Sequence, residues 1–597
     1  MSGQKASRTK RDWFLASVDA QIVTNDHLVD LLVVGSGNGA LTAALCAYEF
    51  GIKHVLVIEK TDQYGGMSAT SGGMVWIPCN REAHELGAQD SAEEAYAYLK
   101  RSTPSNTVPD EMLETYVREA PRMIQFLQAR TRARYRTLAH LREYGELFSR
   151  SMEPEPLCRH FLGSEGNSIR DSHRMHAIAD RIVMTAAETL TLLARRRGWR
   201  RLLARLLREY VRDVPRAFTH RRSRRLACGA AGIARLRWSM IDRGIPLWLN
   251  SRMHQLLTDE TGRVVGAMVN REGNQVEVRA RHGVVLGTGG FEHNQAMREH
   301  YLPKPTSFEW SAAAGANTGD GLRAGIRVGA AVHMMQGGYW SFTFTTPDHP
   351  IPWLARIERS YPGSCVVNRS GLRIENESQD SIDFQRALFA RHSVESPQVP
   401  VWLIFDARFR RKYLVGPLRN SRLRPDWMLP KEYFASGFVT RADSIRNLAE
   451  SAGINADVLS RTVATMNGYA RTGVDLEFQR GEAQYDRLFA DPSVKPNPCL
   501  APIAEAPFYA VRMEPGDFGT QGGLSTDTHA RVLNGKGEPI PGLYAVGNCA
   551  APICPTYPSG GCTLGPAMTF AWQAAQHIAA SVQRSGAVSM QTADRGS

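Results

Sequence analysis

The sequence predicts an α/β protein in which a discontinuous domain, built on a parallel sheet, encloses a second domain of the α+β class. Three apolar runs lead directly into glycine-rich turns, at 28–39, 283–290 and 540–548. A short apolar run that ends in such a turn is typical of a strand buried on both faces of a parallel sheet. Because the three runs lie far apart in the sequence, a domain whose sheet contains all of them must be discontinuous in sequence.

The first run opens a strand–turn–helix–strand unit. Residues 28–34 predict a strand, Gly35-Ser36-Gly37-Asn38-Gly39-Ala40 follows at once, and LTAALCAYEFG predicts a helix that ends at Gly51. A second strand, HVLVIEK, contains Glu59 near its end. This is the G-x-G-x-x-[GA] pattern of dinucleotide-binding sites in the context that it requires, with an acidic residue about 20 residues further on.

Each residue of this motif has a physical role in such a site. Gly35 permits the tight turn, Gly37 lets the backbone approach a pyrophosphate, and Ala40 keeps the helix close to the strand. We expect the pyrophosphate at the helix N-terminus, where backbone N–H groups favour an anion. Glu59 is expected to accept hydrogen bonds from ribose hydroxyls.

The loop at 62–73 favours FAD over NAD as the cofactor. It is rich in Gly and Ser and directly follows the acidic strand, so its backbone donors can follow an extended cofactor toward the ring. The runs at 283–290 and 540–548 resemble the two later FAD motifs of flavoproteins with two dinucleotide-binding domains. We therefore expect a Rossmann-like FAD-binding domain that is discontinuous in sequence.

The C-terminal part carries the most specific pattern. Residues 514–524 read EPGDFGTQGGL, and residues 556–568 read TYPSGGCTLGPAM. Together with the earlier motifs, over most of residues 28–585, these segments resemble the fumarate reductase and 3-ketosteroid dehydrogenase flavoprotein superfamily. The Tyr-Pro, the glycine four residues after the Tyr, and the Thr-x-Gly-Pro-Ala helix start resemble the 3-ketosteroid Δ1-dehydrogenase pattern.

The resemblance implies a set of cofactor-binding residues, and it includes Asp320 in the turn at 317–321. Covalent-flavin members carry a His in the loop at 66–73, and this loop has none, so FAD is expected to bind noncovalently; no metal site is predicted. The expected cofactor-binding residues are Gly35, Gly37, Asn38, Gly39, Ala40, Glu59, Lys60, Gly66, Met67, Ser68, Ser71, Gly72, Gly73, Gly287, Gly289, Asp320, Gly547, Asn548, Thr563 and Leu564.

The same resemblance implies the half of a catalytic site that polarises a ketone. Removing hydrogen from C1 and C2 of a 3-keto steroid requires a polarised C3 carbonyl, a base for the C2 proton and a flavin that takes hydride from C1. Preorganised donors at the oxygen that gains charge provide the polarisation. By resemblance these are the hydroxyl of Tyr557 and the backbone N–H of Gly561.

The residue expected to remove the C2 proton differs from the family pattern. Ser381 stands where the steroid dehydrogenases have a Tyr, and a serine hydroxyl is a poor base unless assisted. Asp380, Asp383 or Tyr339 are the alternatives for this role. A second family Tyr in the N-terminal half is matched best by Tyr144. Three explanations stay open: a Δ1-dehydrogenase with a relocated base, a dehydrogenase acting elsewhere on a steroid-like enone, and a weakly active relative.

A fumarate-reductase-type activity is the alternative within the same superfamily. Those enzymes place an Arg in the last glycine-rich helix start to hold a substrate carboxylate. Residues 562–566, CTLGP, contain no Arg. Because a dicarboxylate needs paired cationic anchors, the sequence favours an apolar steroid-like substrate, with an external electron acceptor to reoxidise the flavin.

The positive charge of the chain is concentrated in one segment. The 597 residues include 72 Lys and Arg against 59 Asp and Glu, a net charge of +13. Residues 195–225 hold thirteen Arg and two acidic residues, so they carry +11 and the rest of the chain +2. The composition excludes global disorder, and nine cysteines without a CxxC pair argue against a disulfide scaffold or zinc ribbon and for a reducing compartment.

That segment predicts an amphipathic helix with an apolar stripe opposite an arginine face. Three interpretations follow: a helix packed on the body with a solvated Arg face, a peripheral membrane anchor, and, least favoured, nucleic-acid binding, since no zinc-finger, RRM or KH signature accompanies the charge. No run of 18 uncharged apolar residues predicts a transmembrane helix. The stripe contains Trp199, Leu202, Leu203, Leu206, Leu207, Tyr210, Val211 and Val214.

The predicted organisation has three parts. Residues 28–293 form the first part of the FAD-binding domain, with the Arg-rich helical insertion at about 160–230. Residues 294–510 form the substrate domain, whose aromatic stretch at 339–344 suits an apolar ligand, and residues 511–585 return to the FAD-binding domain. The expected location is cytoplasmic, on the inner face of the cell membrane if the Arg-rich helix binds it. The oligomeric state is left open.

Overall fold

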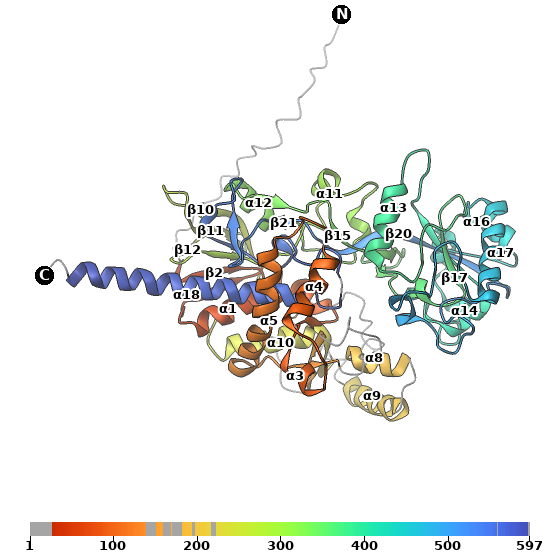
Figure 1. The fold of residues 1–597 in the computed structure, drawn as a ribbon, viewed down its shortest axis with the longest axis horizontal. Helices are drawn as coiled ribbons and strands as arrows, with labels where there is room; N and C mark the ends of the chain where they lie inside the picture. Colours follow the sequence, from red (N-terminus) through yellow and green to blue (C-terminus); the bar gives the residue numbers. More distant parts are fainter. Residues whose placement is uncertain are drawn as a thin grey trace, which may run out of the picture.

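A computed structural model describes residues 27–138, 151–158, 169, 182–193, 198–215, 223–557 and 559–594. Figure 1 shows two lobes. One contains α1, α5, α18 and the strands β10 to β12, and the other contains β17 and the helices α14, α16 and α17. Helices and strands alternate in the first lobe and an antiparallel sheet dominates the second, which confirms the predicted α/β fold class with a second α+β domain.

The first lobe is built on a mostly parallel sheet. Its strand order is β22-β23-β13-β2-β3-β9, and only β22 runs antiparallel to its neighbour. The three runs singled out in the sequence form its centre, as β2, β13 and β23. The strands of this sheet are β2 (Leu31–Val34), β3 (Val55–Ile58), β9 (Leu247–Trp248), β13 (Val284–Leu286), β22 (Arg531–Leu533) and β23 (Pro539–Ala545).

Both faces of this sheet are covered, which explains the uninterrupted apolar strands. Leu31 and Val33 pack in one core with helix α1 (Asn38–Glu49) and helix α18 (Leu564–Asp594). Leu32 and Val34 point the other way, into a core shared with a four-stranded sheet of order β1-β12-β11-β10. Its strands are β1 (His27–Val29), β10 (Ser251–Thr258), β11 (Val264–Arg271) and β12 (Asn274–Ala280).

Further helices and short strands complete the first lobe around α1 and α18. The longest of them, α5, packs on α18, and α10 packs on α1 and α2. The helices are α2 (Gly66–Thr70), α3 (Arg81–Glu85), α4 (Ala92–Ser102), α5 (Asp110–Arg130), α10 (Cys228–Ile241) and α12 (Asp320–Arg327), and the strands are β4 (Val75–Trp76), β5 (Tyr135–Thr137), β6 (Ser151–Pro154), β7 (Leu157–Cys158), β8 (Arg225–Leu226), β14 (Val332–His333) and β21 (Gly523–Leu524).

The second lobe is centred on an antiparallel sheet of order β16-β15-β20-β18-β17, with β19 also paired to β20. The long strand β20 straddles the predicted domain boundary at 510. The strands are β15 (Gly338–Phe344), β16 (Trp353–Leu354), β17 (Ser364–Val367), β18 (Val401–Phe405), β19 (Val439–Ala442) and β20 (Phe508–Thr520). The helices are α11 (Gln295–Tyr301), α13 (Ser381–Arg391), α14 (Ala407–Lys412), α15 (Lys431–Ala435), α16 (Ile445–Ala452) and α17 (Ala456–Thr472).

The Arg-rich segment contains a helix, as the periodicity predicts. Helix α9 (Trp199–Asp213) lies beside α8 (Ala186–Leu193) at the edge of the molecule (Figure 1). The predicted stripe is only partly buried: Leu206 is buried, whereas Leu203, Leu207 and Val211 are exposed. None of the helices in the described part of the chain is long and apolar enough to cross a membrane.

Candidate active site

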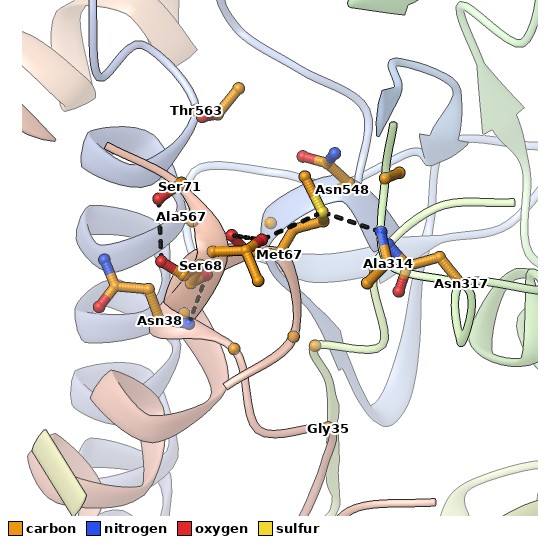
Figure 2. A pocket seen from close by; sticks show the side chains of 18 of the residues that line it. Gly35, Asn38, Met67, Ser68, Ser71, Ala314, Asn317, Asn548, Thr563 and Ala567 are labelled. Carbon is orange, nitrogen blue, oxygen red and sulfur yellow. Dashed lines mark hydrogen bonds between the residues drawn. The ribbon is translucent and has the colours of Figure 1, made fainter. Parts of the chain in front are cut away.

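One large cavity, of about 430 Å³, lies where the glycine turns of the parallel sheet meet strands of the second lobe. Every residue that the sequence predicts to bind the cofactor lines it, from Gly35 to Leu564, and so do Tyr339, Tyr557 and Gly561. Tyr144 lies outside the described residues. The structure therefore brings together segments from both ends of the chain (Figure 2).

Close backbone approach explains two of the glycines in these turns. Gly35 has φ +105°, and a Cβ on it would lie 2.2 Å from the carbonyl oxygen of Gly287. A Cβ on Gly287 would in turn lie 2.8 Å from the Cβ of Ala40. The turns after β2 and β13 thus touch each other and the start of α1, which leaves room only for small residues.

The start of α1 fits a cofactor phosphate. Its N-cap is Gly37, which has no side chain to cap the helix, and the first turn lines the cavity. The N–H of Asn38 donates to the Ser68 hydroxyl over 3.0 Å, which joins the helix to the Gly/Ser-rich loop (Figure 2). An uncapped helix N-terminus that opens into a cavity is suited to a pyrophosphate.

Glu59 is held at the end of β3 by three donors. Its Oε2 accepts from the Ser36 hydroxyl over 2.5 Å, and its Oε1 accepts from the backbone N–H and hydroxyl of Thr61, each over 3.1 Å. The carboxylate is buried yet lines the cavity, so its remaining lone pairs can accept from ribose hydroxyls.

The loop that the sequence assigned to the flavin end is fastened to the second lobe. The Sδ of Met67 accepts from the N–H of Ala314 over 2.9 Å, and Ser71 donates to the carbonyl of Ser68 over 2.8 Å (Figure 2). Thus α2 and the turn before Asn317 form adjoining walls of the same cavity.

Lys60 and Asp320 line the cavity as an ion pair. Lys60 Nζ lies 3.0 Å from Asp320 Oδ2, and Arg252 Nη2 lies 3.0 Å from Oδ1. Although burial alone would raise it, Arg252 and Lys60 hold the pKa of the Asp320 carboxyl well below its usual range. Asp320 therefore stays ionised, and its first role in the structure is to fix the start of α12 against β10.

Tyr557 and Gly561 lie together in a strained turn at the other end of the cavity. Tyr557 has φ +52° and Gly561 φ +100°. A Cβ on Gly561 would lie 2.5 Å from the backbone N of Trp76, whose N–H donates to the Gly561 carbonyl over 3.2 Å. Burial raises the pKa of the Tyr557 phenol, and the positive charge of Arg356 and a hydrogen bond from the Gly561 N–H oppose that rise. The Gly561 N–H thus donates to the Tyr557 oxygen, so the two predicted donors lie side by side.

Aromatic rings surround the side chain of Tyr557. Tyr557 packs edge-on against Tyr339 and Phe518, with ring centroids 5.7 Å and 5.6 Å away, and Tyr339 stacks on Phe518 at 5.8 Å. Ile351 and Leu354 also line the cavity. This end of the cavity is suited to a flat apolar ring system that carries one acceptor oxygen.

The candidates for the base differ in whether they line the cavity. Ser381 is buried, and its hydroxyl accepts from Arg359 Nη2 over 2.8 Å. Asp380 caps α13 and accepts from the Tyr485 hydroxyl over 3.0 Å, while Asp383 lies 3.5 Å from Arg386. These three residues do not line the cavity, and among the alternatives Tyr339 does.

Sequence reasoning missed Arg356 and Ser36. Arg356 lines the cavity with its guanidinium 5.7 Å from the Tyr557 ring centroid, and no motif marks it. Ser36 could have been found from the sequence. It lies within the glycine motif, and the turn that contains it is expected beside the end of the strand that leads to Glu59.

The comparisons with known proteins agree with this site. Residues 30–564 match the family model described as FAD binding domain. The 3-oxosteroid 1-dehydrogenase of Mycolicibacterium smegmatis is 37% identical, over 93% of this chain and 98% of its own. The 4-oxocyclohexanecarboxylate 2-dehydrogenase of Sinomonas cyclohexanicum is 34% identical, over 92% of each chain.

A solved structure extends the likeness to the fold. The 3-ketosteroid delta1-dehydrogenase from Sterolibacterium denitrificans, solved in complex with 1,4-androstadiene-3,17-dione, is 40% identical with a TM-score of 0.86. The match covers 93% of this chain and all of the other. The chain belongs to the FAD-binding flavoprotein family of the 3-oxosteroid 1-dehydrogenases, and it is an FAD-dependent oxidoreductase that acts on CH–CH groups.

Proposed function

We propose that the protein dehydrogenates the C1–C2 bond of a 3-oxosteroid. The observation that carries this proposal is that Tyr557 and Gly561, joined by a hydrogen bond, line the FAD cavity beside the rings of Tyr339 and Phe518. The relatives named 3-oxosteroid 1-dehydrogenase and the solved complex with a steroid dione support the same substrate class.

The two donors act on the ketone oxygen. When the proton at C2 leaves, negative charge develops on this oxygen, and donors fixed in advance stabilise it without having to reorient. Arg356 makes the Tyr557 phenol a stronger donor, since its positive charge opposes the rise in the pKa of that phenol. Bound FAD supplies the hydride acceptor, and an external electron acceptor restores it.

We assign the removal of the C2 proton to Tyr339. Its side chain lines the cavity, and its ring lies edge-on to that of Tyr557, so both hydroxyls serve one ligand. Burial, together with the neighbouring Cys554 and Tyr557, raises the pKa of Tyr339 well above its usual value. The phenolate is therefore scarce at neutral pH but strongly basic where it forms.

Anaerobic reduction of the bound flavin tests the function. We expect androst-4-ene-3,17-dione to bleach the flavin absorbance, with a rate about 100- to 1000-fold lower in Tyr557→Phe at unchanged FAD content. Tyr301→Phe, a change on α11, is the control. If fumarate instead reoxidised the chemically reduced flavin and restored its absorbance, while the steroid bleached nothing, the reductase alternative would be favoured.

A membrane surface is the second partner that we propose, through helix α9. Leu203, Leu207 and Val211 are spaced four residues apart and are 39%, 46% and 66% exposed. The neighbouring face of the helix carries the exposed side chains of Arg201, Arg205, Arg208 and Arg212. An exposed apolar strip flanked by arginines fits the interface of an anionic bilayer, such as the inner face of a cell membrane.

Vesicle binding tests this partner. The holoenzyme should co-sediment with vesicles of phosphatidylcholine and phosphatidylglycerol and less with phosphatidylcholine alone, because the arginines favour anionic headgroups. The triple change Leu203→Ser, Leu207→Ser and Val211→Ser should abolish sedimentation and leave turnover of a detergent-dispersed steroid intact. Sedimentation that survives this change would exclude α9 as the anchor.

A further inference from the structure

Arg356 stands out among the side chains of the active-site cavity. It lies between β16 and the short turn at Glu358–Ser360, is half-buried, and lines the cavity. The other walls at this end are aromatic or aliphatic. A guanidinium cannot lose its charge in a protein, so this end of the cavity carries a permanent cation.

The described part of the chain gives this cation no carboxylate partner. No carboxylate oxygen of the described residues lies within 4.0 Å of the Arg356 guanidinium. Three buried arginines of the protein are paired with carboxylates: Arg298 lies 2.7 Å from Asp517, Arg373 lies 2.7 Å from Glu377, and Arg480 lies 3.2 Å from Glu377. A buried charge without a partner is costly, which is why proteins pair such groups.

The neighbouring groups do not neutralise it either. Arg359 adds a second positive charge, and its donors are used by the carbonyls of Glu377 and Gln379 and by the Ser381 hydroxyl. Arg356 hydrogen-bonds the Tyr485 hydroxyl, and Asp380 is the acidic side chain whose charge acts on it. The oxygens of Asp380 already accept from Tyr485 and from the N–H of Ile382.

The cofactor does not supply the missing charge. Its pyrophosphate is expected at the start of α1, at the end of the cavity formed by Gly37 and Asn38, and the oxidised flavin ring is neutral. The Arg356 guanidinium lies instead beside Tyr557, 5.7 Å from the centroid of its ring. What remains to face it is the substrate.

We propose that Arg356 binds a carboxylate of the substrate, so that the enzyme selects a ring ketone that also carries an acid group. This inference rests on the proposed oxidation next to a ring ketone and names a feature of the molecule that is oxidised. The ketone oxygen would contact Tyr557 and Gly561, and the carboxylate would accept two parallel hydrogen bonds from the guanidinium. Arg356 is then a specificity-determining residue, and neutral ketosteroids use only the ketone half of the site.

The compact spacing favours an acid group close to the reacting ring. Because Arg356 lies against the same ring of Tyr557 whose hydroxyl faces the ketone, one small molecule can reach both groups. A six-membered ring with a ketone and a carboxylate on opposite carbons has this shape. A carboxylate at the far end of a long side chain does not.

Matched substrates and matched variants test the proposal on the FAD-loaded enzyme. The probes are 4-oxocyclohexanecarboxylate, its neutral methyl ester and androst-4-ene-3,17-dione, each followed by anaerobic flavin bleaching. In Arg356→Gln we expect kcat/KM for the acid to fall about 10- to 100-fold, the range for a hydrogen bond between charged groups. The ester and the steroid should both fall by a smaller common factor, about threefold or less, which reflects the weaker Tyr557 donor without Arg356. Arg356→Lys should retain part of the preference for the acid, and Arg369→Gln, an exposed position in the same lobe, should change nothing.

Binding without chemistry gives a second readout. Cyclohexanecarboxylate has no ketone, so it cannot be oxidised, and it should bind to the wild-type holoenzyme and to Arg356→Lys in calorimetry but not to Arg356→Gln. Thermal unfolding of the unliganded variants separates this role from a structural one. Removing a half-buried cation that has no carboxylate partner should raise Tm or leave it unchanged, whereas loss of a structural contact would lower it.

The outcomes separate this inference from the proposed function. Equal losses for the acid, the ester and the steroid in Arg356→Gln would show that Arg356 acts on the ketone oxygen, and would overturn the carboxylate proposal. So would equal activity of acid and ester in the wild type. If the steroid bleaches the flavin and 4-oxocyclohexanecarboxylate does not, the proposed function is supported and this inference is refuted. If no ketone bleaches the flavin while cyclohexanecarboxylate binds through Arg356, the proposed function fails and the anion site stands.

Discussion

The Ser36 hydroxyl donates to Oε2 of Glu59 over 2.5 Å, and this bond joins the glycine turn after β2 to the acidic end of β3. The same hydroxyl accepts from the N–H of Gly65 over 3.0 Å, at the start of the loop that leads to the flavin. One serine thus fixes the position of the carboxylate that we expect to bind the ribose relative to both glycine-rich segments. The carboxylate is pre-oriented, so the cofactor does not have to order it on binding.

The first prediction concerns this carboxylate. In Glu59→Gln, one acceptor oxygen becomes an NH2 donor that cannot accept from a ribose hydroxyl. We expect the Kd for FAD to rise about 10- to 100-fold, measured by titrating the apoprotein and following flavin fluorescence. Glu260→Gln, in an exposed turn, is the control. An unchanged Kd would show that the ribose binds elsewhere.

Sequence reasoning located the cofactor half of the site because that half depends on backbone. The glycines at 35 and 287 are required by contacts between main chains, and such contacts leave a spacing pattern that is visible in the sequence. The same holds for Gly561, whose φ of +100° excludes most side chains. Fold and cavity could therefore be predicted from a few turns.

The substrate half could not be predicted in the same way. Arg356 reaches the cavity from a turn without a motif, and its meaning depends on which carboxylates lie near it in space. Ser381 occupies the position where the family has a Tyr, and only the fold shows that Arg359 binds its hydroxyl. Side chains that meet across distant segments leave no local spacing signal.

The second prediction tests the backbone strain at Gly561. In Gly561→Ala, the new Cβ would lie 2.5 Å from the backbone N of Trp76 at a φ that side chains disfavour, so the turn must shift. We expect destabilisation of about 1–3 kcal/mol in thermal unfolding. Flavin reduction by a ketosteroid should also slow about 100-fold, because the N–H donor moves away from the ketone oxygen.

A matched glycine controls for the added methyl group. Gly535 lies in a turn where a Cβ would meet nothing within 4 Å, so Gly535→Ala should change neither Tm nor rate. A Gly561→Ala variant that is destabilised but fully active would remove the Gly561 N–H from the proposed mechanism.

The third prediction is the pH dependence of flavin reduction. A phenol takes a proton only as phenolate, and burial together with Cys554 and Tyr557 raises the pKa of Tyr339 well above 10. The rate should therefore rise with pH across the whole neutral range, by up to about tenfold per pH unit. Tyr339→Phe should lower the rate about 100-fold or more and flatten the profile in anaerobic stopped-flow measurements.

Tyr469→Phe, on α17 in the second lobe, is the control for this profile. If Tyr339→Phe slows the reaction but keeps the wild-type slope against pH, another group accepts the proton. Tyr339 would then be a wall of the cavity only.

The fourth prediction concerns Glu292, a fully buried carboxyl behind the active site. Its Oε1 accepts from the N–H of Thr520 over 3.0 Å, and its Oε2 has no hydrogen-bond partner in the described part of the chain. Burial, and then the negative charge of Asp517, raise the pKa of Glu292 to about 7 from an ordinary value of 4.5. The folded protein thus prefers the neutral acid.

The sign of the effect follows from proton linkage. Between pH 4.5 and about 7 the folded state binds a proton that the unfolded state has lost, so the free energy of unfolding falls as pH rises through this window. The accumulated loss is on the order of 3 kcal/mol above pH 7. Glutamine mimics the neutral acid, so Glu292→Gln should unfold at a higher Tm than wild type near pH 8 and at the same Tm near pH 4.5. Calorimetric scans across this range measure the difference, with exposed Glu260→Gln as the control; a variant less stable than wild type near pH 8 would mean that Glu292 is held as a carboxylate.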